Sequence, residues 1–141
     1  MTPEQNKNFV QQLFDEVMNG HNLSVVGKYI APGFLHHGVP GAKGGPDGFA
    51  STLQQFFDAF PDMHVHPESV IADGDTVATR GYITGTHHGN FMGIPGTGKQ
   101  IRIDYIDVWK IENDKAIENW VQMDAVGMMQ QIGAMPSPAT A

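Results

Sequence analysis

Two aspartates in the last third of the chain stand close to large aromatic residues, where a carboxyl group could act on a bound substrate. Asp107 lies between Tyr105 and Trp109, and Asp124 follows shortly after Trp120. Burial among apolar groups raises the pKa of an aspartate, which can then accept a proton from a substrate and later return it. Asp124 could equally cap a helix that begins near residue 125, so both interpretations of Asp124 stay open.

Six of the seven histidines occur in close pairs, an arrangement that is compatible with proton transfer or with metal binding. Two of the pairs are adjacent in sequence, namely His36–His37 and His87–His88. Because consecutive residues of a strand point to opposite faces of the sheet, at most one histidine of each adjacent pair can face the interior. An interior histidine is of catalytic interest when a buried carboxylate lies nearby, and is otherwise an ordinary core residue.

The third pair belongs to the pattern His64-x-His66-x-Glu68, which would place three metal-ligating side chains on one face of a strand. Pro67 interrupts regular strand pairing at this point, and the spacing matches no established metal motif. We therefore interpret His64 and His66 as outward-facing residues and expect no bound metal.

The segment GIPGTGKQ, residues 93–100, has the spacing of a phosphate-binding loop except that Gln100 replaces the final serine or threonine. Such a loop binds phosphate because a helix follows it and its N-terminus faces the anion. Here the following residues, QIRIDY, alternate between polar and apolar and predict a strand. We therefore interpret the segment as a glycine-rich connection between two strands, without nucleotide binding.

The composition of the 141-residue chain excludes several classes of protein. Its length suits one domain, and its net charge of −7 with eight scattered lysines and arginines argues against nucleic acid and anionic membranes. The sequence contains no apolar run long enough to span a membrane, and its polar beginning does not resemble a signal peptide. The absence of cysteine excludes disulfides and thiolate chemistry and fits the cytoplasm, where we expect the protein to reside.

The apolar periodicity predicts helices in the first part of the chain and strands in the second. The expected helices span residues 3–20, 22–30 and 46–60, and a short one lies within 127–133. The expected strands span residues 33–38, 63–72, 75–88, 100–112 and 115–125. The order predicts an α+β domain over residues 1–135, with helices on one face of a curved antiparallel sheet and a disordered tail at 136–141.

On the last expected strand, two sets of side chains alternate between the faces of the sheet. One face carries Glu118, Trp120, Gln122 and Asp124, and the other carries Ile117, Asn119, Val121 and Met123. The first face combines an aromatic residue, an amide and two acids, so we expect it to belong to the functional site.

Three stretches of the chain resemble the SnoaL-like polyketide (ester) cyclase family. They are GTHHGNFMGIPGTGK, YIDVWKIENDKAIENW with the following Asp124, and the closing QQIG; the earlier FDAFPDMHV resembles the family's F-P-D segment. The resemblance covers about residues 5–133. Two departures are visible, since Gly96 stands where the family usually has a second proline and Asn113–Ala116 replaces its usual D-G-K-I turn.

The resemblance implies an NTF2-like fold, in which a cone of three N-terminal helices packs on a curved antiparallel sheet around an apolar pocket. It also implies a site without cofactor and a homodimer or higher homo-oligomer. Carried over residue by residue, it places the catalytic aspartate on Asp124 and a pocket histidine on His37. We expect the catalytic residues to be Asp124, His37 and His88. The expected substrate-binding residues are Phe14, His87, Tyr105, Asp107, Trp109, Trp120 and Gln122.

The characterised cyclases of this family close a ring by intramolecular aldol condensation, and the resemblance implies the same chemistry here. The substrate would be an apolar or polycyclic small molecule, and an aspartate would act as general base and then as general acid. A hydrolase, dehydratase or isomerase using the same pocket is an alternative, as is a non-catalytic dimer that binds a small molecule.

Overall fold

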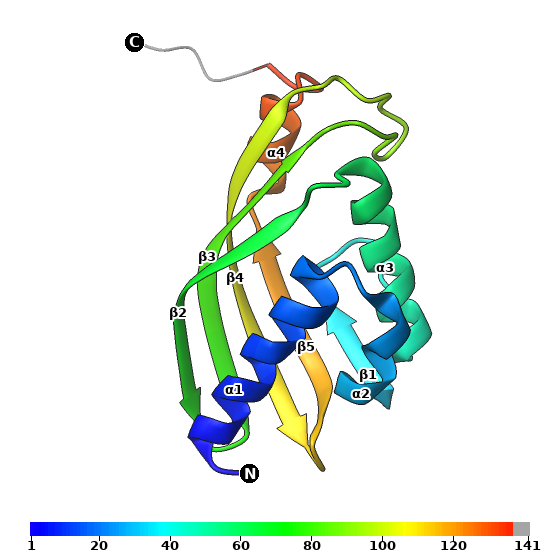
Figure 1. Ribbon diagram of the computed structural model, residues 1–141. Helices are drawn as coiled ribbons and strands as arrows, with labels where there is room; N and C mark the ends of the chain where they lie inside the picture. The colour runs from blue at the N-terminus through cyan, green and yellow to red at the C-terminus, as the bar shows by residue number, and fades with distance from the viewer. Residues whose placement is uncertain (137–141) are drawn as a thin grey trace.

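The computed structural model describes residues 1–136, so residues 137–141 of the tail that we expect to be disordered lie outside it. Helices precede most of the strands, as expected, and a further helix follows them (Figure 1). The helical segments are α1 (Pro3–Leu13), η1 (Phe14–Asn19), η2 (Leu23–Val25), α2 (Val26–Tyr29), α3 (Gly45–Ala59) and α4 (Ala125–Gln131). The strands are β1 (Ile30–His37), β2 (His64–Asp73), β3 (Thr76–Thr86), β4 (Gln100–Glu112) and β5 (Lys115–Met123). The expected α+β class is confirmed.

The five strands form one curved sheet in the order β1-β5-β4-β3-β2. Strands β2 to β5 are an antiparallel meander, whereas β1 pairs in parallel with β5 at the edge of the sheet. The expected antiparallel sheet is therefore corrected at this edge. The difference arises because α3 carries the chain from β1 across the concave face to β2 at the opposite edge (Figure 1). Strand β1 is therefore not part of the meander and pairs only with its last strand, β5.

The first helix begins where the sequence predicts, but its last turns have a different geometry. Thr2 and Gln5 form a reciprocal capping box, and Pro3 occupies the first turn. The segment Phe14–Asn19, expected to continue as α-helix, is π-helical. Such wider turns are rare and occur mostly at functional sites, and this one carries Phe14 to the interior. At Gly20 a Cβ atom would lie 2.4 Å from the Glu16 carbonyl oxygen, so only glycine fits.

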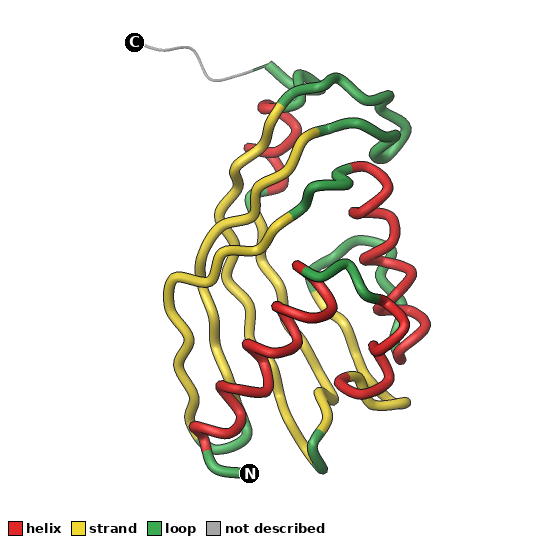
Figure 2. Tube along the Cα trace, viewed as in Figure 1, coloured by secondary structure: helices red, strands yellow, loops and turns green. Residues whose placement is uncertain are grey.

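The helix expected over residues 22–30 is shorter than the sequence indicates. A 3-10 turn and the single turn of α2 take its place, and β1 already begins at Ile30. Asn22 caps the 3-10 turn through its side chain, which accepts from the Ser24 amide. Helices α1 and α3 cover the concave face of the sheet (Figure 2), and a cavity lies beneath them. Within residues 1–136, no helix has the length and apolar character required to cross a bilayer.

The glycine-rich segment connects β3 to β4, and β4 begins at Gln100, which confirms that a strand and not a helix follows it. His87 anchors both ends of this connection, because its amide donates to the Lys99 carbonyl at 2.9 Å and its carbonyl accepts from the Gly98 amide at 2.8 Å. Gly98 has a φ of 72°, which favours glycine at this turn. The segment therefore lacks the helix N-terminus that phosphate binding in such a loop requires.

Candidate active site

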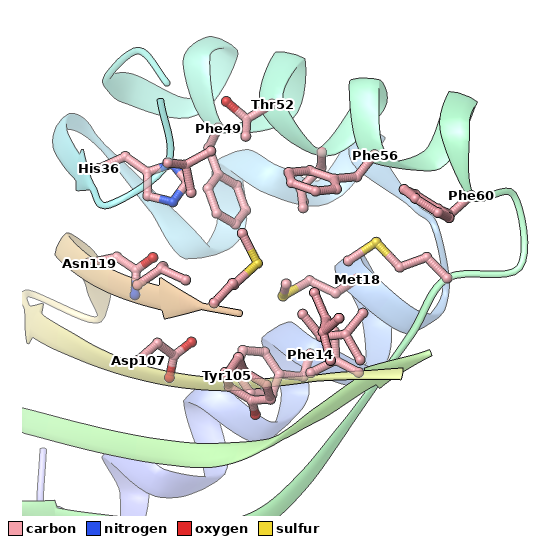
Figure 3. Close-up of a pocket in the computed structure, with 18 of the residues that line it drawn as sticks. Phe14, Met18, His36, Phe49, Thr52, Phe56, Phe60, Tyr105, Asp107 and Asn119 are labelled. Carbon is pink, nitrogen blue, oxygen red and sulfur yellow. The ribbon is translucent and has the colours of Figure 1, made fainter. Parts of the chain in front are cut away.

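A cavity of about 60 Å³ lies between the concave face of the sheet and helix α3 (Figure 3). Most of its walls are apolar, with Phe56 and Phe60 of α3 at one end. The other end carries His36, Asp107 and Asn119, which come from β1, β4 and β5 (Figure 3). An apolar chamber with a few polar groups gathered at one end is the usual arrangement of a small-molecule site.

Asp107 is the acidic group of this cavity, and its side chain is only 4% exposed. It lies on the inward face of β4, opposite Thr79 of β3 and Val121 of β5. Burial raises the pKa of Asp107 to about 7, although a hydrogen bond donated by Thr79 Oγ1 to Asp107 Oδ1 at 2.5 Å acts in the opposite direction. Near neutral pH the carboxyl group can therefore both accept and donate a proton.

Two hydroxyl groups extend the hydrogen-bond network of Asp107. The Tyr105 hydroxyl lies 3.1 Å from Thr79 Oγ1, which itself contacts the carboxyl group. A threonine hydroxyl has one proton and can rotate, so it can donate to ionised Asp107 or accept from the protonated acid. The network therefore satisfies both protonation states of Asp107. Burial raises the pKa of Tyr105 to about 12, so its hydroxyl stays protonated at neutral pH.

We expect Thr79→Val to raise the pKa of Asp107 further, on the order of one unit. The hydrogen bond that the variant lacks stabilises the ionised carboxylate, so without it the neutral acid is favoured. The pKa can be followed by ¹³C NMR titration of the Asp107 carboxyl carbon. Thr84→Val is the matched control, since Thr84 lies on the same strand and its hydroxyl contacts His66 instead. An unchanged Asp107 titration in Thr79→Val would contradict the proposed hydrogen bond.

His36 is the histidine that faces the cavity, whereas the sequence resemblance favours its neighbour His37. Its imidazole packs against Phe34 and Phe49, with ring centroids 5.6 Å apart in both cases. Burial and the neighbouring His37 lower the pKa of His36, so the ring is neutral at pH 7. The available signal was alternation on β1, because buried Phe34 two residues earlier marks the inward face.

Asn119 is a second cavity residue that is not among those expected from the sequence. It lies on β5 opposite His36 of β1 and Trp109 of β4, so it connects the two strands across the floor of the cavity. Its Nδ2 donates to the Val108 carbonyl at 3.0 Å, which fixes the orientation of the amide. Asn119 was missed because we assigned the opposite face of this strand to the functional site.

Four of the expected substrate-binding residues line the cavity, namely Phe14, Tyr105, Asp107 and Trp109. The face of β5 expected to belong to the site is instead its outer face, where Trp120 and Gln122 are exposed. The physical reason is pairing with β4, since Asn119 and Val121 oppose the inward-facing Trp109 and Asp107. Trp120 and Gln122 therefore lie outside the cavity lining.

The three expected catalytic residues also lie away from the cavity lining. Asp124 is exposed and caps α4, where its Oδ1 accepts from the Gly127 amide at 2.8 Å. His37 is on the outer face, paired with Glu118 at 2.7 Å and stacked on Trp120. His88 is exposed in the loop after β3. A catalytic role for these side chains would require a rearrangement that brings them to the substrate.

The remaining histidines have structural contacts in the described part of the chain. His87 is fully buried beneath the β3–β4 connection, with Nδ1 3.0 Å from Thr97 Oγ1. The His66 ring lies 4.5 Å from the His64 ring and contacts Thr84 at 2.9 Å, whereas Glu68 pairs with Arg80 at 3.8 Å. Within residues 1–136, no group of three or more histidine or acidic side chains is arranged to hold a metal ion.

Comparison with known proteins identifies the family of this chain. The family model for SnoaL-like polyketide cyclase matches residues 8–132. The chain is similar to DauD, an aklanonic acid methyl ester cyclase of Streptomyces sp. (strain C5), at 28% identity over 116 residues, which is 81% of this chain and 71% of DauD. It is equally similar to DnrD of Streptomyces peucetius, an enzyme of the same description, at 28% identity over 79% of this chain and 77% of DnrD.

Solved structures show the same fold. Wild-type IdmH of Streptomyces antibioticus is 28% identical, with a TM-score of 0.80 over 92% of this chain and 99% of the IdmH chain. The cone of helices on a curved sheet is the NTF2-like fold that the sequence resemblance implied, with a parallel edge strand and a fourth helix in addition. Because the family model covers most of its length, this chain belongs to the SnoaL-like polyketide cyclase family.

Proposed function

We propose that this protein is a polyketide cyclase that closes a ring by intramolecular aldol condensation, with Asp107 as its general base and general acid. The observation that supports this most is a buried carboxyl group with a pKa of about 7 at the polar end of an apolar cavity. Membership of the SnoaL-like family supports the class of substrate. The reaction needs no cofactor, because a carbon between two carbonyl groups is already acidic.

The proposed reaction conserves all atoms of the substrate. Ionised Asp107 accepts a proton from the carbon between two carbonyl groups and leaves an enolate. The enolate carbon forms a bond to a second carbonyl carbon of the same molecule, whose oxygen becomes an alkoxide. Protonated Asp107 then returns the proton to that oxygen, so acid and carboxylate alternate. The apolar walls exclude water and hold the two carbons close together.

We propose Asp107 as the general base, in place of the Asp124 that the sequence resemblance implies, because of where the two carboxyl groups lie. Asp107 lines the cavity and is buried, whereas Asp124 is exposed and already accepts a helix-capping hydrogen bond. A carboxylate in water is a weak base near pH 7, and burial is what makes it stronger. Catalysis by Asp124, His37 or His88 remains a prediction that variants of these residues would test.

Substrate entry requires the cavity to grow, because about 60 Å³ is much less than the roughly 300–1,000 Å³ of typical ligand sites. Four methionines in its walls provide the means, since methionine is unbranched and changes rotamer readily. They are Met18, Met63, Met123 and Met128. We propose that these side chains move aside when the substrate binds.

Aklanonic acid methyl ester is the first substrate to test, because two curated relatives carry its name. Aldol closure yields a product of unchanged mass, whereas ester hydrolysis or dehydration changes the mass, so mass spectrometry of the reaction separates these chemistries. A new product of equal mass with a shifted chromatographic position supports the cyclase. Loss of the methyl group would favour a hydrolase, and binding without any product would favour a non-catalytic binding protein.

An isomerase is the second candidate, and the Asp107 site favours it over a hydrolase, a dehydratase or a non-catalytic binding protein. A single carboxyl group with a pKa near neutrality can move a proton between two carbons without forming a carbon–carbon bond. Two-dimensional NMR of an equal-mass product distinguishes the isomerase from the cyclase, because only the cyclase creates a new ring junction.

We propose that the outer face of the sheet forms a homodimer, because it exposes large apolar side chains. Leu35, Ile106 and Trp120 are 52%, 58% and 41% exposed on neighbouring strands. Patches of this kind on a soluble protein mark interaction surfaces. The small-molecule substrate would then be bound independently by each copy, because the cavity lies on the concave face.

We expect Ile106→Glu to convert the dimer to a monomer, because a charge buried at the centre of the interface has no partner. Sedimentation velocity measures the change as a halved mass. Met92→Glu is the matched control, since Met92 is 73% exposed but lies in the β3–β4 connection. A wild-type protein that sediments as a monomer, or an Ile106→Glu protein that stays dimeric, would contradict an interface on this face.

A further inference from the structure

We propose that Trp109 Nε1 and His36 Nδ1 form a pair of hydrogen-bond donors for the substrate carbonyl oxygen that becomes the alkoxide. This inference rests on the proposed aldol chemistry and adds to it two residues with a defined role. Its basis is that both nitrogens belong to cavity-lining side chains, are buried, and have no hydrogen-bond partner in the part of the chain that the structure describes.

The two donor rings belong to one aromatic cluster. Phe34 contacts both His36 and Trp109, with ring centroids 5.6 and 6.4 Å apart. Phe49 also contacts both, with ring centroids 5.6 and 6.2 Å apart. Each donor ring is therefore held by the same two phenylalanines, which limits its rotation.

The strand register places the donor pair beside the general base. Asn119 of β5 is the register partner of His36 on one side and of Trp109 on the other, so the three residues form a row across the sheet. Asp107 lies two residues from Trp109 on the same face of β4. Trp109 Nε1 approaches the Asp107 carboxyl group without reaching ordinary hydrogen-bond geometry. A carbonyl oxygen at this end of the cavity would therefore lie near both the donors and the acid.

Unpartnered buried donors are costly, which is why native proteins contain few of them. Trp109 is 1% exposed, so water reaches its indole nitrogen poorly. An indole N–H can only donate, and a neutral imidazole with its proton on Nδ1 donates from that atom. The ligand chemistry that satisfies both is a single acceptor oxygen with partial or full negative charge, as in a ketone, an ester or an enolate.

In the proposed reaction these donors stabilise charge and do not change protonation. The alkoxide oxygen forms between Trp109 Nε1–H and His36 Nδ1–H, which strengthen their hydrogen bonds as negative charge develops. The proton that neutralises the alkoxide comes from Asp107, which received it from the substrate carbon. Each donor is thus a catalytic residue that contacts the reacting oxygen, in the manner of an oxyanion hole.

The indole NMR signals test the proposal directly, because the chain contains only two tryptophans. Acetophenone is the probe, and α-methylstyrene is its matched control, in which a methylene group replaces the carbonyl oxygen. In ¹H–¹⁵N spectra we expect acetophenone to move the Trp109 indole signal downfield and α-methylstyrene to move it much less. The exposed Trp120 indole serves as an internal reference. Equal shifts with the two probes would overturn the proposal.

Variants test the same contacts through affinity. Trp109→Phe and His36→Phe should each weaken acetophenone binding roughly 3- to 10-fold, the loss of one ordinary hydrogen bond. Binding of α-methylstyrene should change less than about twofold, which also shows that the variant is folded and its cavity intact. Equal losses for the two probes would assign Trp109 and His36 a role in shape alone.

These measurements separate failure of the donor pair from failure of the proposed function, because they require no turnover. If the protein binds acetophenone as described but closes no ring, the proposed cyclase function is contradicted and the proposed donor pair is still supported. A protein whose Trp109→Phe and His36→Phe variants both form the cyclised product at the wild-type kcat would contradict the donor pair and leave the cyclase standing.

Discussion

Replacing Asp107 with asparagine is expected to lower kcat/KM roughly 10²- to 10⁴-fold, the usual contribution of a positioned general base. Asparagine has nearly the shape of aspartate and keeps an acceptor for the Thr79 hydroxyl, so the cavity should stay intact. It cannot accept a proton from the substrate carbon. Steady-state kinetics and substrate titration together should therefore show lost turnover with the dissociation constant changed only a few-fold.

Two further aspartate variants make this test specific. Asp104→Asn is the matched control, because Asp104 lies on the same strand but is exposed to solvent. Asp124→Asn examines the aspartate that the family resemblance favours. Asparagine keeps an acceptor for the Gly127 amide and is as good a helix cap as aspartate, so we expect little change in stability or in kcat/KM. A greater loss of kcat/KM in Asp124→Asn than in Asp107→Asn would return the role of general base to Asp124.

The fold could be predicted from the sequence to the extent that it depends on local signals. The capping box of Thr2 and Gln5 marks the beginning of α1, and the turn at Gly74 separates β2 from β3. Strand β4 alternates so regularly from Ile101 to Ile111 that its inward face is evident. The parallel pairing of β1 with β5 could not be predicted, because strand order depends on contacts between distant segments.

The candidate site was predictable where one face of an element is clearly apolar and not where both faces are mixed. Tyr105, Asp107 and Trp109 follow from the alternation of β4 and do line the cavity. On β5, Trp120 made the outer face look like the site, whereas the inner face carries Asn119. Only the register between β4 and β5 decides between them, and register is not encoded in the pattern of a single strand.

The sequence pattern does not decide between His36 and His37 for a related reason. His36 and His37 differ by one position, so a shift of one residue in strand phase exchanges the inward and outward ring. The sequence resemblance favoured His37, but the structure places His37 beside Glu118 on the outer face and His36 in the cavity. Phe34 marks the inward face of β1, but the neighbouring Leu35 is also apolar, so the sequence leaves the phase open and the contact of Phe34 with Phe49 decides it.

The buried Asp107 should also make the protein less stable as the pH rises. Its pKa is 3.8 in the unfolded chain and about 7 in the folded one, so between these values the folded state holds a proton that the unfolded state has lost. Stability from the neutral acid is therefore fully present below about pH 4 and is lost as the pH rises through about 7. Between about pH 5 and pH 8 the expected loss is about 3 kcal/mol in the free energy of unfolding.

Asp107→Asn isolates this effect, because asparagine does not titrate and every other ionisable group is shared with the wild type. The free energy of unfolding can be measured with urea at about pH 5 and pH 8. The difference in this free energy between the variant and the wild type should rise by about 3 kcal/mol, in favour of the variant, from the lower pH to the higher. Equal pH dependence of the two proteins would mean that the folded Asp107 carboxyl has an ordinary pKa. An acid that can exchange protons at neutral pH must lie in surroundings that disfavour its charge, so lost activity and gained stability should appear in the same variant.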